Sequence, residues 1–186
     1  MEVHFKSLIV DVTKREFSFT LDNGSYLRYL SFSSLVEFTE SLKKLRPKKI
    51  DIGAIYNLKP SERKSFSASS LIPLSKELVF DIDVSDYDNF RNCCQGKGMC
   101  RLCWKYCRVA IEFLDETLRS RTLFLPLDDF GFEDLMWVFS GRRGVHCWVS
   151  DATAVSLKSS SRASLLHYLE IPVVPNSLFW SLILVF

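Results

Sequence analysis

The sequence predicts an α+β fold in which a mixed or antiparallel sheet packs against helices. First, apolar residues make up 47% of the 186 residues and include fifteen Phe and four Trp, which is ample material for a packed core. Second, segments of alternating apolar and polar residues, typical of half-buried strands, are interspersed with segments of helical spacing. Strands and helices mixed in this order are typical of layered α+β domains.

The first part of the chain supplies a hairpin, a helix and a strand. Alternating apolar positions flank Asn23-Gly24, a strong turn signal, so residues 17–31 are expected to form a hairpin. Apolar residues recur every three or four positions over 33–45, which predicts an amphipathic helix. A short strand is expected at 50–56, and the Ser-, Lys- and Pro-rich stretch 59–76 is expected to be a loop.

The second part alternates strands and helices around a cysteine-rich loop. The expected elements are a buried strand that opens 77–88 and ends in carboxylates, a cysteine-rich loop at 93–103, a helix from Trp104 to Leu118, two strands joined by a tight turn over 135–150, and a helical region over 151–170 capped by Asp151 or Thr153.

Charge and apolar runs restrict the function classes. The net charge of +2 is too small to indicate a nucleic-acid partner by itself. The apolar stretch Leu178–Phe186 is too short to cross a bilayer core, which takes about 20 helical residues, so we expect no membrane partner. No secretory signal opens the chain, and six Cys without one favour a reducing compartment and metal binding over disulfides.

Asp81 and Asp83 lie two residues apart at the end of an apolar strand. Strand alternation places both side chains on one face, with Cα atoms roughly 6.5–7 Å apart. Two carboxylates in this arrangement suit the divalent cations of nucleotidyl transfer. The alternative is that they are exposed residues at a strand end.

The turn SGRRGVH places Ser140, Arg142, Arg143 and His146 around two glycines. Glycines permit a tight turn with open backbone N–H groups, and arginine binds phosphate oxygens in a bidentate manner. The alternative is a hairpin turn that is basic without binding phosphate. A cation site and a phosphate site together describe a nucleoside-triphosphate site.

Four cysteines, Cys93, Cys94, Cys100 and Cys103, fall within eleven residues. Zinc prefers four tetrahedral thiolates, and C-x2-C is a usual zinc spacing. A closed site of four thiolates would be structural, because it leaves no coordination position for a substrate. The alternative is a set of unpaired buried thiols; Cys107 and Cys147, without partner spacing, are expected in the core.

Several of these segments together resemble a known family. The segments KREFSFTL, KIDIGAIY, KELVFDIDVSDYD, the cysteine cluster and LMWVFSGRRGVHCWV resemble, in the same order, the eukaryotic DNA primase small (catalytic) subunit of the archaeo-eukaryotic primase family. The resemblance covers roughly residues 14 to 170. It implies an incomplete primase catalytic domain over 1–170 with a zinc-binding loop at 93–103, followed by a divergent apolar tail over 171–186.

The resemblance also implies an activity. It is the synthesis of short RNA primers on single-stranded DNA from ribonucleoside triphosphates, in the nucleus, with the primase large subunit and the DNA polymerase alpha complex as partners. The implied residue roles are Mg²⁺ or Mn²⁺ ligands (Asp81, Asp83), a further active-site acid (Glu16), phosphate contacts (Ser140, Arg142, Arg143, His146), a further nucleotide contact (Arg28) and ligands of a structural Zn²⁺ (Cys93, Cys94, Cys100, Cys103).

The sequence departs from the family pattern at several places. Members carry a third metal-binding aspartate downstream of SGRRGVH, whereas no Asp follows Asp151. Residues 120–127 look like an insertion, and the first dozen residues replace a helical N-terminal region. We therefore expect a truncated or alternatively spliced product with little or no activity on its own. The alternatives are a non-catalytic protein that retains zinc and nucleotide or large-subunit binding, and a zinc-dependent nucleic-acid-binding module.

Overall fold

The computed structural model describes residues 12–119 and 130–169, and the backbone of 184–185. The chain divides into two compact units, residues 1–76 and 77–186, called here the N-terminal unit and the C-terminal unit. The expected insertion at 120–127, the replaced first residues and nearly all of the apolar tail lie outside the described residues. Within the described ranges, no helix is long and apolar enough to cross a membrane.

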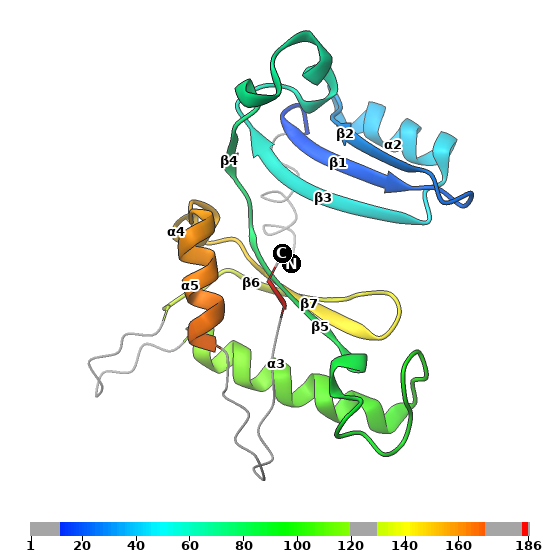
Figure 1. Ribbon diagram of the computed structural model, residues 1–186, viewed down its shortest axis with the longest axis vertical. Helices are drawn as coiled ribbons and strands as arrows, with labels where there is room; N and C mark the ends of the chain where they lie inside the picture. The colour runs from blue at the N-terminus through cyan, green and yellow to red at the C-terminus, as the bar shows by residue number, and fades with distance from the viewer. Residues whose placement is uncertain (1–11, 120–129, 170–183, 186) are drawn as a thin grey trace. The chain divides into compact units, whose positions relative to one another are not determined.

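The N-terminal unit is built on an antiparallel sheet with the strand order β2-β1-β3-β4 (Figure 1). The hairpin predicted over 17–31 is confirmed, and Gly24 supplies the left-handed backbone of its turn with φ 82°. The elements are β1 (Arg15–Thr20), β2 (Tyr26–Leu30), α2 (Leu35–Leu45), β3 (Lys49–Tyr56), the 3₁₀ helices η1 (Pro60–Ser65) and η2 (Ala68–Ser70), and β4 (Pro73–Ser75).

Helix α2 confirms the amphipathic segment predicted over 33–45. The Ser34 hydroxyl accepts a hydrogen bond from the Glu37 backbone N–H at 3.2 Å, and the Glu37 carboxylate accepts from the Ser33 N–H at 2.7 Å. The apolar face of α2 packs on the sheet through Phe38, whose ring centroid lies 4.8 Å from that of Phe17. This aromatic contact helps to form the core of the unit.

The stretch 59–76 is more regular than the loop expected from its composition. It contains η1, η2 and β4, and β4 pairs with β3. The Asn57 side chain organises it, because its amide donates to the Ser70 carbonyl at 3.0 Å and its oxygen accepts from the Ile72 N–H at 2.8 Å. These contacts span 13 and 15 residues, so local composition did not reveal them.

The C-terminal unit has an antiparallel sheet with the order β6-β7-β5-β8 (Figure 1). The elements are β5 (Leu78–Asp83), η3 (Val84–Tyr87), η4 (Arg101–Cys103), α3 (Trp104–Arg119), β6 (Leu135–Phe139), β7 (Gly144–Val149), α4 (Ala152–Val155), α5 (Ser159–Leu169) and β8 (Leu184–Val185). The strands expected at the start of 77–88 and over 135–150 and the helices expected over 104–118 and 151–170 are confirmed, whereas the 3₁₀ helices and strand β8 were not predicted.

Helix α3 supplies much of the core of this unit. Its residues Cys107, Ala110 and Leu114 recur at helical spacing, are fully or almost fully buried, and belong to one apolar cluster with Phe80 of β5. Cys147 of β7 is buried in the same cluster. The expectation that Cys107 and Cys147 are core residues is confirmed.

Asp151 corrects one detail of the prediction. It occupies the N-cap position of α4 but makes no side-chain capping bond. Instead its carboxylate accepts hydrogen bonds from the backbone N–H groups of Glu133 and Asp134 at 2.9 and 3.0 Å. The carboxylate of Asp151 therefore binds the segment before β6 and does not cap the helix as predicted. Thr153, the other predicted cap, lies inside α4.

Candidate functional site

The two aspartates at the end of β5 face β7. The register pairs Asp81 with His146 and Asp83 with Gly144. Ile82, between the two aspartates, points into the core with 2% exposure, whereas both aspartates are partly exposed. Strand alternation thus places the two carboxylates on the face opposite the core side chain.

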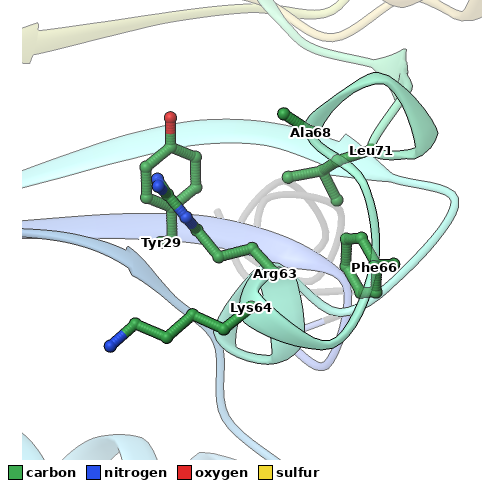
Figure 2. Close-up of a pocket in the computed structure, with 6 residues that line it drawn as sticks. All are labelled: Tyr29, Arg63, Lys64, Phe66, Ala68 and Leu71. Carbon is green, nitrogen blue, oxygen red and sulfur yellow. The ribbon is translucent and has the colours of Figure 1, made fainter.

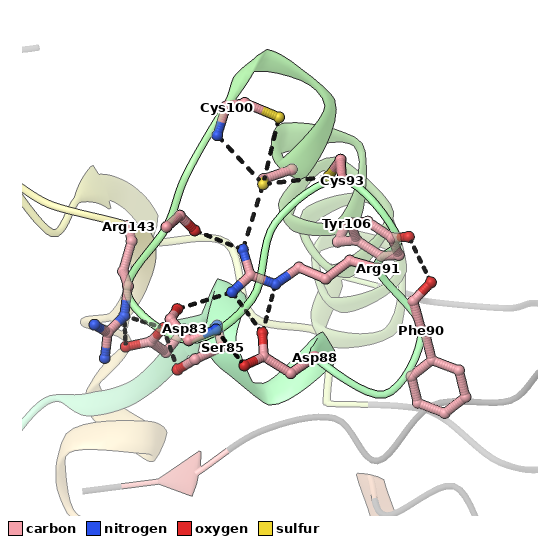
Figure 3. Close-up of polar contacts among 12 residues, drawn as sticks. Asp83, Ser85, Asp88, Phe90, Arg91, Cys93, Cys100, Tyr106 and Arg143 are labelled. Carbon is pink, nitrogen blue, oxygen red and sulfur yellow. Dashed lines mark hydrogen bonds and ion pairs between the residues drawn. The ribbon is translucent and has the colours of Figure 1, made fainter.

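Asp83 is held by an arginine and by its own turn (Figure 3). The Arg143 Nε donates to both carboxylate oxygens at 2.6 and 2.8 Å, and the N–H and hydroxyl of Ser85 donate to Oδ1 at 2.8 and 2.7 Å. Partial burial acts to raise the pKa of Asp83, but the hydrogen bonds from Arg143 and Ser85 outweigh it and lower the pKa below its usual value. Asp83 is therefore an anion at neutral pH.

Arg143 retains unused donor capacity. Its Nη1 is buried and has no hydrogen-bond partner among the described residues. A buried donor without an acceptor costs about 1–3 kcal/mol, so the arrangement favours an additional acceptor at this guanidinium. An oxygen-rich anion is the acceptor that the geometry of arginine fits best.

His146 and Asp81 form the second contact across the strands. The His146 Nε2 lies 3.3 Å from Asp81 Oδ1, and the two side chains are 32% and 38% exposed. Both remain accessible from solvent, as a site that exchanges ligands requires.

The turn between β6 and β7 is closed by Ser140. Its backbone N–H donates to the Gly144 carbonyl at 3.0 Å, and its hydroxyl accepts from the Gly144 N–H at 3.0 Å. The expectation of open backbone N–H groups is therefore wrong for these two residues, because the turn uses them to close itself. Gly141 supplies the left-handed conformation with φ 86°, and Arg142 is exposed.

Gly144 is required for a different reason. A Cβ at this position would lie 2.2 Å from the backbone carbonyl oxygen of Ile82. Only glycine permits β7 to approach β5 this closely, and the approach lies beside Asp83, which is its register partner.

The other two predicted site residues lie together in the N-terminal unit. Glu16 is 5% exposed; Arg28 Nη2 lies 3.4 Å from its Oε1, and the Tyr56 hydroxyl donates to Oε2 at 3.2 Å. Burial first, and the negative charge of Glu16 second, raise the pKa of Tyr56 to about 12. The three residues line a hollow of about 350 Å³ together with Ser18, Tyr26, Asp51, Ile52, Gly53, Ala54 and Lys76. Asp81 and Asp83 belong to the C-terminal unit.

The cysteine loop gathers all four predicted thiols. Their sulfur atoms lie within 4.8 Å of one another, with 3.5 Å between Cys93 and Cys103 and 3.8 Å between Cys100 and Cys103. A tetrahedral zinc ion with bonds of about 2.3 Å would hold its sulfurs about 3.8 Å apart. The cluster, completed by Cys94, therefore fits a single metal ion.

Arg91 organises the cysteine loop, and sequence reasoning missed it (Figure 3). The residue is 1% exposed, and its guanidinium donates to the carbonyls of Gly96 and Gly98 at 2.8 Å each. It also donates to Cys103 Sγ at 3.3 Å and pairs with Asp88 at 2.5 Å. The position of Arg91, two residues before the pair Cys93-Cys94, was a weak signal of a role in the loop. No local spacing indicates that its guanidinium binds Asp88, two carbonyls and a sulfur.

These contacts favour one thiolate within the cluster. Burial acts to raise the pKa of Cys103, but the Cys100 N–H, Arg91 and the neighbouring thiols lower it to about 6. The pKa of Cys94 is instead raised to about 12, first by its hydrogen bond with Cys100 and then by burial. Neighbouring thiols resist ionising together, and a bound cation removes that resistance.

Comparisons with known proteins identify the family of the chain. A family model described as DNA primase small subunit matches residues 80–179. The DNA primase small subunits of Saccharomyces cerevisiae and Schizosaccharomyces pombe are 45% and 42% identical to the chain over 161 and 163 residues, which is 87% and 88% of its length. The DNA primase small subunit PriS of the archaeon Pyrococcus abyssi is 31% identical over 164 residues, or 88% of the chain.

The matched regions make up 37%, 34% and 43% of these three relatives, so the chain spans well under half the length of each. The family match includes both aspartates, the cysteine loop and the SGRRGVH turn. The chain belongs to the DNA primase small subunit family.

Proposed function

We propose that this chain carries the cation- and phosphate-binding part of a nucleotidyl-transfer site that makes short RNA primers on single-stranded DNA. One observation carries the proposal. Asp81 and Asp83 of β5 lie at ion-pair distance from His146 and Arg143, which β7 and its turn supply. Carboxylates for a divalent cation thus lie directly beside an arginine and a histidine, which are nitrogen donors suited to phosphate oxygens.

Asp81 and Asp83 would hold Mg²⁺ or Mn²⁺. Both present carboxylate oxygens, the ligands that these hard cations prefer, on an exposed face of the strand. When bound, the cations would supply charge neutralisation and activation of a primer 3′-hydroxyl for attack on the α-phosphate, with pyrophosphate as the leaving group.

Ser140, Arg142, Arg143 and His146 would contact the triphosphate. Arg142 is exposed, and Arg143 has a donor without a partner in the described residues. Ser140 would act chiefly by holding the turn, because its hydroxyl already accepts from Gly144. Fixed cations beside the triphosphate stabilise negative charge as it develops in the transition state.

The cysteine cluster would bind a structural Zn²⁺. Four thiolates fill the tetrahedral coordination of zinc, so no position remains for a substrate. Cys93, Cys94, Cys100 and Cys103 would then stabilise the loop that follows β5 and η3.

The proposal extends to the rest of the enzyme. Glu16 would be a further active-site acid and Arg28 a further nucleotide contact, both from the N-terminal unit. The primase large subunit, the DNA polymerase alpha complex, a single-stranded DNA template and ribonucleoside triphosphates would be its partners, in the nucleus. The relatives from Saccharomyces cerevisiae and Schizosaccharomyces pombe are DNA primase small subunits, which supports this assignment.

Binding of Mn²⁺ and of Mn²⁺ with ATP, measured by calorimetry, tests the site. Asp81→Asn should weaken both. Arg143→Gln should bind Mn²⁺ alone at least as well as wild type, because Asp83 loses its competing guanidinium, but should bind Mn²⁺–ATP about tenfold more weakly. Glu116→Gln on α3 removes an exposed acid elsewhere and serves as the control. Unchanged Mn²⁺–ATP binding by both site variants would contradict the proposal.

Primer synthesis tests the activity itself. The chain is incubated with a pyrimidine-rich single-stranded template, ribonucleotides and Mn²⁺, with and without the primase large subunit. We expect a small amount of primer product, because the third metal-binding aspartate of the family is absent from this sequence, and no product from Asp81→Ala. Triphosphate binding without products under either condition would favour a non-catalytic role.

A further inference from the structure

A second hollow in the N-terminal unit has a different character from the one at Glu16. It has a volume of about 250 Å³, shares no lining residue with the Glu16 hollow, and is called here the Tyr29 pocket (Figure 2). Its lining combines an aromatic ring, two cations and apolar side chains: Tyr29, Arg63, Lys64, Phe66, Ala68 and Leu71.

Arg63 stacks on the ring of Tyr29. Its guanidinium carbon lies 3.9 Å from the ring centroid, within the range of a cation–π contact, and the residue as a whole is exposed (Figure 2). A planar guanidinium on an aromatic ring presents a flat surface on which a nucleobase can stack.

Tyr29 is held in an unusual conformation. Its φ is 60°, in the left-handed region that a bulky residue rarely adopts. The register between β1 and β2 shifts here, because Phe17 pairs with Leu30 whereas Phe19 pairs with Leu27, which leaves one extra residue in β2. Bulges of this kind redirect a side chain, and strain of this kind is concentrated at binding sites.

The two walls of the pocket are tied together. The Ser31 hydroxyl, just after β2, donates to the Ser61 hydroxyl at 2.8 Å and accepts from the Ser61 N–H at 3.2 Å. Ser61 lies in η1, the element that carries Arg63 and Lys64. These bonds hold η1, which carries the two cations, beside the end of β2, which carries Tyr29.

We propose that the Tyr29 pocket binds one nucleotide of a single-stranded nucleic acid. The base stacks on the Arg63 guanidinium, which the Tyr29 ring supports from the other side, Phe66 and Leu71 offer apolar contact, and Lys64 pairs with a backbone phosphate. Stacking and cationic contact of this kind are typical of single-strand binding without sequence readout. The inference rests on the proposed function for the identity of the ligand, whereas the pocket itself is independent of Asp81 and Asp83.

Fluorescence anisotropy with a labelled oligo(dT) 12-mer, without nucleotide or added divalent cation, tests the proposal on the whole chain. Arg63→Gln should weaken binding about fivefold or more, and Arg63→Lys should weaken it nearly as much because the planar surface is lost. Lys64→Gln should weaken binding and reduce the salt dependence by about 0.7 in slope. Lys158→Gln, an exposed cation in the C-terminal unit, should leave binding unchanged.

Tyr29 variants separate a binding role from a folding role. Tyr29→Phe keeps the ring and should bind as wild type, whereas Tyr29→Asn removes the ring but tolerates the left-handed backbone. Tyr29→Asn should therefore bind more weakly without the loss of thermal stability that misfolding would cause.

Several outcomes would overturn the proposal. They are equal binding by wild type and Arg63→Gln, wild-type affinity in Arg63→Lys, and a loss in Lys158→Gln as large as that in Arg63→Gln. Displacement of the oligonucleotide by ATP, at the concentration that saturates Mn²⁺–ATP binding, would also overturn it. Asp81→Asn distinguishes the two proposals, because it should weaken Mn²⁺–ATP binding and leave oligonucleotide binding intact.

Discussion

The cysteine cluster and the aspartate pair gather candidate ligands in the same unit of the chain but in different numbers and geometries. The four sulfurs of the cluster lie within 4.8 Å of one another; Cys103 is fully buried, and the other three cysteines are partly exposed. The carboxylates of Asp81 and Asp83 are 38% and 33% exposed. Four thiols can fill the tetrahedral coordination of one ion, whereas two carboxylates leave coordination positions open for a substrate. The number of ligands, more than their exposure, therefore distinguishes the two candidate centres.

The arginines of the two centres differ in the same way. The Arg91 side chain is fully buried, and its donors are distributed over two carbonyls, a carboxylate and a sulfur. The Arg143 side chain is 21% exposed, pairs with Asp83 and leaves one donor without a partner in the described residues. Arg91 is fixed by many contacts, whereas Arg143 has a donor available for a further acceptor.

Replacing a cysteine of the cluster should have the largest effect. Cys103→Ser removes a thiolate and the acceptor of the Arg91 bond, so the zinc ion proposed for the cluster, about one per chain in the wild type, should be lost. Metal analysis together with proteolysis of the loop 93–103 measures the loss. Cys147→Ala, a buried thiol outside the cluster, should lose some stability but retain the metal. Full metal content in Cys103→Ser would exclude the four-thiolate site.

Replacing Arg91 should follow in size. Arg91→Gln leaves the Asp88 carboxylate and two carbonyls without their buried partner, and we expect a loss of about 3 kcal/mol in the free energy of unfolding. Urea denaturation of the metal-loaded protein measures it. Arg108→Gln on the exposed face of α3 should change stability little, because its pair with Glu112 is open to solvent. Similar effects of both variants would contradict an organising role for Arg91.

Replacing Gly144 should have the next largest effect, and it should affect the site at Asp81 and Asp83 but not the cysteine cluster. Gly144→Ala forces β7 away from the Ile82 carbonyl, with an expected loss of about 2 kcal/mol and weaker Mn²⁺–ATP binding. Gly24→Ala is the matched control, because Gly24 has φ 82° and open space around it. That variant should lose about 1 kcal/mol through backbone strain and bind Mn²⁺–ATP normally. Normal binding by Gly144→Ala would show that the close approach does not shape the site.

The same contrast explains what the sequence predicted. The cysteine spacing, the alternation that exposes Asp81 and Asp83, and the glycine-bounded turn are local patterns, and each predicted feature is present in the structure. Local patterns report on neighbours in the chain. They therefore predicted most helices and strands, and the α+β class with them.

The rest depends on partners distant in sequence. The pairing of Arg143 with Asp83 spans 60 residues, and that of Asp151 with Glu133 spans 18. Ser140 offered no signal that its hydroxyl would close the turn, and nothing in the composition of 59–76 indicated that β4 joins β3. The partners of these charged and polar side chains depend on which distant segments the fold brings together, so the sequence pattern around each residue could not predict them.

Acid titration of the metal-free protein should give the smallest effect. The pKa of Asp83 is lowered in the folded state, so the stability that this carboxylate contributes is fully present above its unfolded pKa of about 3.9 and is lost as the pH falls through the folded value. The unfolding free energies of wild type and Arg143→Gln should therefore differ by a small constant amount above about pH 5, because solvent screens a partly exposed pair, and converge below about pH 4. Arg142→Gln, which removes the exposed neighbouring cation, should differ from wild type by an amount that does not depend on pH in this way. If the difference in unfolding free energy between wild type and Arg143→Gln instead widened on acidification, Arg143 would not be the group that holds Asp83 as an anion. The contrast drawn between Arg91 and Arg143 would then be wrong for Arg143.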